Sequence, residues 1–214
     1  PEDVVLIHNL GVKTYRMSIE WARIEPSRGE LNWSALLHYR AEIAALRLAG
    51  IRPLITLHHF TFPQWVRELG GWEWEGAPEA FRHFAQIVYQ VVAPGTRDWV
   101  TINEPMVHLV AGYLGGLAPP GKKELQAVRA PLIGLLRAHA AAYHELHLQA
   151  ARAGVEIRVG VAHHLRVFDA WNRFNPLDKL LTRVLDNTFN WALHLALEYG
   201  RILIDVPFGL HEDQ

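Results

Sequence analysis

The sequence has no cysteine, so disulfide bonds, thiolate nucleophiles and cysteine-ligated zinc sites are excluded. It has no excess of charge of one sign, because 21 basic and 22 acidic residues give a formal net charge of −1. The basic residues form no run, so we expect no nucleic acid partner and no polybasic membrane patch. No apolar stretch approaches the roughly 20 residues that span a bilayer. No signal peptide is recognisable after Pro1, and we expect a cytoplasmic protein without a membrane partner.

Half of the 214 residues are hydrophobic, and the sequence includes 8 Trp, 8 Phe and 6 Tyr. This composition is typical of one folded domain with a large core, and we expect a single partial domain over residues 1–214. Aromatic side chains in this number also suit a site that stacks flat ligands such as sugar rings.

Helical and strand patterns alternate along the chain. An opening helix over residues 2–10 precedes strands at 12–19, 51–57, 99–104 and 156–162, with helices at 34–49, 78–92, 124–153 and 176–200. Strands that alternate with helices indicate an α/β fold with a parallel sheet and right-handed crossovers. A nucleotide-binding doubly wound sheet is the weaker choice, because no strand leads into G-x-G-x-x-G or a P-loop. Four strand–helix units make half of a (β/α)8 barrel, also called a TIM barrel.

Polar side chains stand at the carboxyl end of every predicted strand: Glu20, His58–His59, Asn103–Glu104 and His163–His164. In a (β/α)8 barrel, catalytic residues lie at these ends. Glu104 closes a mostly apolar run in the segment WVTINEP, which places a carboxyl where burial and charge tune its chemistry. The alternative is an ordinary glutamate at a strand end that faces solvent.

The two histidine pairs raise the question of a metal site. Adjacent residues on a strand point to opposite faces, so neither pair chelates an ion without distortion, and we expect no metal. The same alternation puts His58 on the packing side when His59 faces the site.

Several segments in order along the chain resemble the glycoside hydrolase family 1 β-glycosidases, which are retaining (β/α)8 enzymes. The matching segments are YRMSIEWARI (15–24), TLHHF (56–60) with Pro63, GGW (70–72), WVTINEP (99–105), GY (112–113) with PPG (119–121), and LRAH (136–139). The resemblance covers the chain up to about residue 202 and implies the second to fifth strand–helix units of the barrel. It implies a β-glycoside substrate and no cofactor.

The resemblance also implies roles for individual residues. Glu104 matches the acid/base carboxyl, and Asn103 matches the amide that holds the sugar 2-hydroxyl. His59 matches the histidine that binds another glycon hydroxyl, its alternative being a hydrogen-bonded core imidazole. Arg16 matches the arginine that keeps the nucleophile ionised, its alternative being an interior ion pair with Glu20 or Glu104. Phe60 falls where many members have a sugar-stacking tryptophan.

Other elements of the family pattern have no match in these residues: the first strand with its sugar-binding Gln, the nucleophile in Thr-Glu-Asn-Gly, and the last-strand Trp and Glu. We therefore expect about half of a β-glucosidase-type enzyme, inactive as an isolated fragment. A related retaining barrel enzyme such as a cellulase is a second interpretation. A non-catalytic half-barrel that binds sugar, or that self-associates through exposed sheet edges, is a third.

Overall fold

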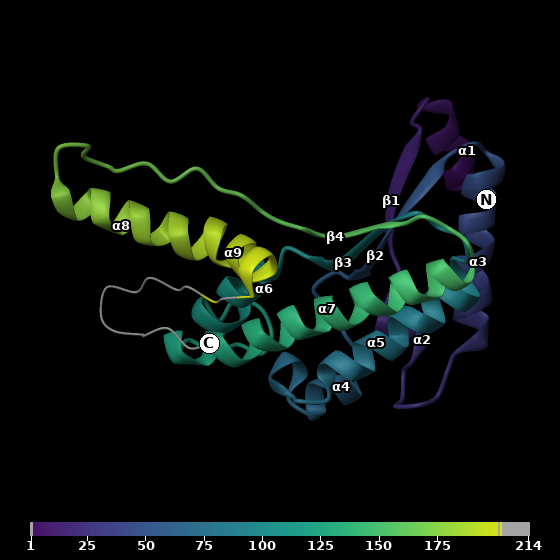
Figure 1. Cartoon of the computed structure of the whole chain (residues 1–214), viewed down its shortest axis with the longest axis horizontal. Coiled ribbons are helices and arrows are strands. Elements are labelled where there is room, and N and C mark those ends of the chain that lie inside the picture. Colours follow the sequence, from purple (N-terminus) through teal and green to yellow (C-terminus); the bar gives the residue numbers. More distant parts are fainter. Residues whose placement is uncertain (1, 201, 203–214) are drawn as a thin grey trace. The chain divides into compact units, whose positions relative to one another are not determined.

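The computed structural model describes residues 2–200 and 202. They fall into two compact units, Pro1–Ala162 and His163–Gln214. The first unit holds the parallel sheet and the helices around it, and the described residues of the second unit include helices and no strand (Figure 1). The prediction of one partial domain over residues 1–214 stays a prediction.

The sheet of the first unit has four parallel strands in the order of the chain. They are β1 (Thr14–Ser18), β2 (Arg52–His58), β3 (Asp98–Asn103) and β4 (Arg158–Ala162). Ser18 pairs with Thr56, and His58 pairs with Ile102, so the carboxyl ends of neighbouring strands lie at one level. This arrangement confirms the predicted α/β class.

Helices connect these strands and cover the sheet. In the first unit they are α1 (Glu2–Asn9), α2 (Trp21–Ile24), α3 (Trp33–Leu48), α4 (Gln64–Glu68), α5 (Ala77–Ile87), α6 (Pro105–Leu109) and α7 (Arg129–Arg152). The core includes the fully buried rings of Trp21, Phe81 and Phe84. A Cβ atom on Gly134 of α7 would overlap the carbonyl oxygen of Trp72, so glycine is required at this contact. None of the described helices is long and apolar enough to cross a membrane, and the cytoplasmic location stays a prediction.

The helix boundaries follow local chemistry closely. Asn32 caps α3, because its side-chain oxygen accepts a hydrogen bond from the Ala35 amide at 3.1 Å. The predicted helix at 78–92 continues from α5 into a π-helical turn at Val88–Val92. The one predicted at 124–153 opens as a 3-10 turn, Leu125–Val128, before α7. The short helices α2, α4 and α6 were not predicted from the sequence.

The second unit contains α8 (Pro176–Asp186), a π-helical turn (Asn187–Trp191) and α9 (Ala192–Tyr199). Asn175 caps α8 as predicted, accepting from the Leu177 amide at 3.0 Å. Gly200 ends α9 with a φ of 68°, a conformation that costs glycine little. The segment after residue 202, for which the sequence predicts no regular pattern, lies outside the described residues.

Candidate active site

β3 is the central element of the candidate site. All six of its residues are buried, and the strand delivers Asn103, which is 3% exposed, followed by the half-buried Glu104. Pro105 is the first residue of α6, where its missing N–H costs no hydrogen bond. The strand therefore ends between an amide and a carboxyl that lie at the start of a helix.

The backbone of Glu104 has an unusual conformation. Its φ of 46° and ψ of 59° lie in the left-handed region, which costs a residue with a side chain on the order of 1–3 kcal/mol. Two hydrogen bonds hold this turn: the Glu104 amide donates to Ala162 O at 2.7 Å, and its carbonyl accepts from the His108 amide at 3.1 Å. Such outliers cluster at functional sites, so the strain is consistent with a functional carboxyl.

Arg16 and Asn103 meet although β2 lies between their strands. The Nη2 of Arg16 donates to Asn103 Oδ1 at 2.6 Å, and its Nε donates to the Thr56 hydroxyl at 2.8 Å. Thr56 is fully buried on β2 and completes a row of polar groups across three strands. Thr56 was not among the predicted site residues, and its signal in the sequence is a polar residue inside an apolar strand.

The alternative for Arg16, an interior ion pair with Glu20 or Glu104, is not observed with Glu20, whose carboxylate has other partners among the described residues. The Glu20 carboxylate accepts from the Ala22 amide at 3.2 Å and from the Thr61 hydroxyl at 2.6 Å. It thereby caps α2 and ties it to the loop after β2. Glu20 is a structural residue in this unit.

His59 and Phe60 follow β2 and lie at the same end of the sheet. His59 is exposed and its Nδ1 shares a hydrogen bond of 2.8 Å with the Ser18 hydroxyl at the end of β1. Phe60 is 38% exposed and has a φ of 70°. Its ring lies parallel to that of His108, with 6.4 Å between the ring centroids. His59 thus bonds to β1, and Phe60 rests on α6.

His58 points into the core, as the alternation predicted. It is 1% exposed, its Nδ1 donates to Thr61 O at 3.1 Å, and its ring lies edge-on to Trp72 and His108. Burial lowers the pKa of His58 well below its usual value, and burial lowers the pKa of His108 to about 4. Both imidazoles are therefore neutral near pH 7, and they pack rather than carry charge.

Two further contacts fix the surroundings of the site. Thr101 of β3 shares a hydrogen bond of 2.7 Å with His139 of α7, which anchors the strand to its helix. Lys122 Nζ lies 2.7 Å from a carboxylate oxygen of Glu73, joining loops that are 49 residues apart. These residues contribute to the site indirectly, because they hold in place the elements around Glu104.

The remaining histidine pair belongs to the second unit. There, His163 Nε2 donates to Asn190 O at 2.9 Å. In the part of the chain that the structure describes, no group of three or more His, Asp or Glu side chains could hold a metal ion. The expectation of no metal stays a prediction.

The parallel α/β sheet, with polar residues at its carboxyl end, defines part of a (β/α)8 barrel of the β-glycosidase type. A β-glycosidase from Pyrococcus horikoshii matches with a TM-score of 0.83 and 31% identity, over 95% of this chain and 46% of that chain. A family 1 β-glucosidase from Thermotoga maritima matches with a TM-score of 0.82, over 91% of this chain and 43% of that chain. The match to the glycosyl hydrolase family 1 model spans residues 1–201, so the chain belongs to glycosyl hydrolase family 1.

Relatives identified by sequence agree with this assignment. Rat lactase/phlorizin hydrolase is 37% identical over 167 residues, which is 75% of this chain and 9% of the relative. β-Glucosidase A of Thermotoga maritima is 34% identical over 142 residues, which is 66% of this chain and 32% of the relative. The chain therefore spans less than half of the length of these relatives, and it corresponds to a partial barrel.

Proposed function

We propose that this chain is the acid/base segment of a retaining β-glycosidase that hydrolyses β-linked glycosides, of the β-glucosidase type. The observation that carries the proposal is the contact of 2.6 Å between Arg16 and Asn103, next to the strained Glu104. Membership of glycosyl hydrolase family 1 supports the same reaction. In (β/α)8 enzymes the catalytic residues lie at the carboxyl ends of the barrel strands, as Asn103 and Glu104 do.

Each candidate residue has a distinct role in this proposal. Glu104 protonates the leaving oxygen and later deprotonates the attacking water, as a retaining mechanism requires of its acid/base. The buried Asn103 holds the 2-hydroxyl of the sugar, and the accessible His59 binds a second hydroxyl. Phe60 provides the apolar surface for the sugar ring, with His108 behind it. Arg16 lies next to the position of the nucleophile and keeps it ionised.

The hydrogen bond between Arg16 and Asn103 supports the role proposed for Asn103. The guanidinium of Arg16 reaches the oxygen of Asn103, so the Asn103 amide group keeps its N–H donors for a ligand. Because an arginine cannot be deprotonated in proteins, it also fixes which end of the amide is the acceptor. Asn103 is thereby oriented before substrate binds.

A retaining glycosidase needs a second carboxyl about 5–5.5 Å from the acid/base. The sequence of this chain contains no Thr-Glu-Asn-Gly segment that would supply the family's nucleophile. We therefore propose that the chain alone is inactive, and that activity requires joining it to the strands that carry the nucleophile.

The test uses this chain fused to the complementary strands of a family 1 relative. Glu104→Gly in the fusion is expected to slow an alkyl β-glucoside at least about 10²-fold, within the range that acid–base catalysis supplies. A dinitrophenyl β-glucoside should still form the glycosyl-enzyme, because its phenolate leaves without a proton, and should then stall. Azide, which needs no general base, should restore turnover and give a β-glycosyl azide.

The matched control is Glu75→Gly, which removes an exposed carboxyl from a loop and should leave both substrates unaffected. Equal slowing of both substrates by Glu104→Gly, or no rescue by azide, would exclude Glu104 as the acid/base.

A second candidate is a non-catalytic half-barrel that binds sugar or self-associates. The observation that favours it is the exposure of Tyr15 and Arg16 on β1, which has one neighbouring strand among the described residues. Unpaired strand edges promote association between chains. A chain that sediments as a monomer at all concentrations would contradict self-association.

A further inference from the structure

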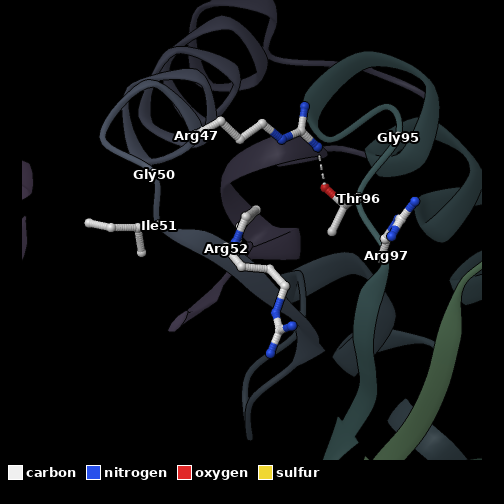
Figure 2. A pocket seen from close by; sticks show the side chains of 8 residues that line it. Arg47, Gly50, Ile51, Arg52, Gly95, Thr96 and Arg97 are labelled. Carbon is white, nitrogen blue, oxygen red and sulfur yellow. Dashed lines mark hydrogen bonds between the residues drawn. The ribbon is translucent and has the colours of Figure 1, made fainter. Parts of the chain in front are cut away.

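A pocket of about 330 Å³ lies at the amino end of β2 and β3 (Figure 2), whereas Glu104 follows the carboxyl end of β3. Its lining consists of Arg47, Gly50, Ile51, Arg52, Pro53, Gly95, Thr96 and Arg97. These residues come from the end of α3, the turn after it and the start of β2, and from the turn before β3. The pocket is therefore formed within the first unit, by the segments that lead into two neighbouring strands, β2 and β3.

Arg47 forms a fixed wall of this pocket. Figure 2 shows its side chain extending from the end of α3 to Thr96, where Nη2 donates to the hydroxyl oxygen at 2.6 Å. The same nitrogen donates to Pro94 O at 2.9 Å. Partial burial lowers the pKa of Arg47, as expected for a guanidinium that has lost some of its hydration but stays charged at neutral pH. The pocket thus contains a positioned positive charge.

Thr96 adds a hydrogen-bond donor to this wall. It is 2% exposed, and its hydroxyl oxygen already accepts from Arg47. A hydroxyl group has one hydrogen as well as its lone pairs, so that hydrogen can donate to a ligand oxygen.

Arg52 and Arg97 stand on the rim, one at each strand start. The Nε of Arg52 lies 3.0 Å from Asp98 Oδ2, and Asp98 also pairs with Arg158 at 2.6 Å. One carboxylate thus faces two guanidiniums. The side chain of Arg97 is exposed and has no hydrogen bond or ion pair within the described residues. The rim therefore has more positive charge than its carboxylate neutralises.

We propose that this pocket binds a phosphate dianion, either free or as the phosphoryl group of a small monoester. Three arginines and no acidic residue line the pocket, although the whole chain has a net charge of −1. Guanidinium groups match the geometry of phosphate oxygens and bind them with two parallel hydrogen bonds. The volume is at the lower end of the range for small-molecule sites, which suits a phosphate with a short organic group.

The proposal is tested on the whole 214-residue chain by titration calorimetry with inorganic phosphate and, separately, with glycerol phosphate, at constant ionic strength in chloride. Saturable one-to-one binding is expected. Arg97→Gln should weaken it about tenfold, because a charge-assisted hydrogen bond is lost. Since the Arg97 side chain bonds to no described residue, this variant should keep the fold, which circular dichroism checks.

Arg52→Gln is the second variant, and Arg158 remains there to pair with Asp98. The matched control is Arg40→Gln, an exposed arginine on the same helix as Arg47, and it should bind phosphate like the unaltered chain. If the chain binds inorganic phosphate but not glycerol phosphate, the ligand is the free ion. If it binds both equally well, the ligands of the pocket include phosphate monoesters. Either result supports the site. Absence of saturable binding, equal affinity in Arg97→Gln, or acetate binding as tightly as phosphate overturns it.

Discussion

β3 and β1 each supply one side of the contact between Asn103 and Arg16, yet their surroundings differ. β3 lies between β2 and β4, and all six of its residues are buried. β1 pairs with β2 alone among the described strands, and its Tyr15 is 38% exposed. Packing on both sides fixes the amide of Asn103, whereas two hydrogen bonds fix the guanidinium of Arg16. The same site thus has one side held mainly by packing and one side held by hydrogen bonds.

The largest expected effect is on the free energy of unfolding, when a substitution creates a cavity at Trp99 of β3. Trp99 is 2% exposed, stacks on Tyr89 and donates its indole N–H to Thr96 O at 2.9 Å. Trp99→Ala should lower the free energy of unfolding by about 3–5 kcal/mol, measured by urea denaturation. The matched control is Tyr15→Ala on β1, which should cost about 0.5 kcal/mol or less. Equal losses in the two variants would contradict the difference between the strands.

An intermediate effect on the free energy of unfolding is expected when the pH is lowered. Burial lowers the pKa of His108 to about 4, so the folded chain favours the neutral imidazole, while the unfolded chain takes up a proton near pH 6.5. Stability from this group is present above about pH 6.5 and is lost as the pH falls towards 4, by about 3 kcal/mol. His58 shifts in the same direction.

His108→Phe separates this contribution from carboxylate titration, and the ring keeps the contact with Phe60. Its unfolding free energy should fall less between pH 6.5 and pH 4 than that of the unaltered chain. His83→Phe, at an exposed position on α5, is the control and should leave the pH profile unchanged. A parallel profile in His108→Phe would show that the buried imidazole does not limit acid stability.

The smallest effect tests the contact between the two strands. In a double-mutant cycle with Arg16→Met and Asn103→Ala, the coupling should be about 1 kcal/mol, reduced from that of a buried charged hydrogen bond because Arg16 is exposed. Arg16→Met combined with Gln90→Ala is the control, since Gln90 bonds to Gln149 instead. Those two changes should be additive. Additivity of the Arg16 and Asn103 changes would show that solvent competes successfully for the guanidinium.

Much of the sheet was predictable from the sequence because short-range signals agree with the fold. The run before Glu104 is mostly apolar, as a strand buried on both faces requires, and β3 is indeed buried. Asn175 before Pro176 is a strong start signal, and the cap is present in the structure. The separation of His58 from His59 followed from the period of two along a strand.

Other features of the site depend on contacts between residues that are far apart in the sequence, which the hydrophobic periodicity does not predict. The sequence identifies Arg16 and Asn103 separately, but their contact needs the side chain of Arg16 to pass Thr56 on the strand between them. The left-handed backbone of Glu104 was not predictable either, because glutamate has no preference for this conformation. It arises where the chain turns from β3 into α6, with Ala162 of β4 holding the amide.

The hydrogen bond from Glu104 to Ala162 also sets a limit on how this chain can be shortened or transplanted. Glu104 belongs to the third strand–helix unit, but the acceptor of its amide lies 58 residues later, at the end of β4. A graft that stops before β4 would transfer the carboxyl without the acceptor that supports its turn. The smallest portable version of this carboxyl therefore includes the long α7 and β4, and an engineer who exchanges barrel segments should place the junction after residue 162.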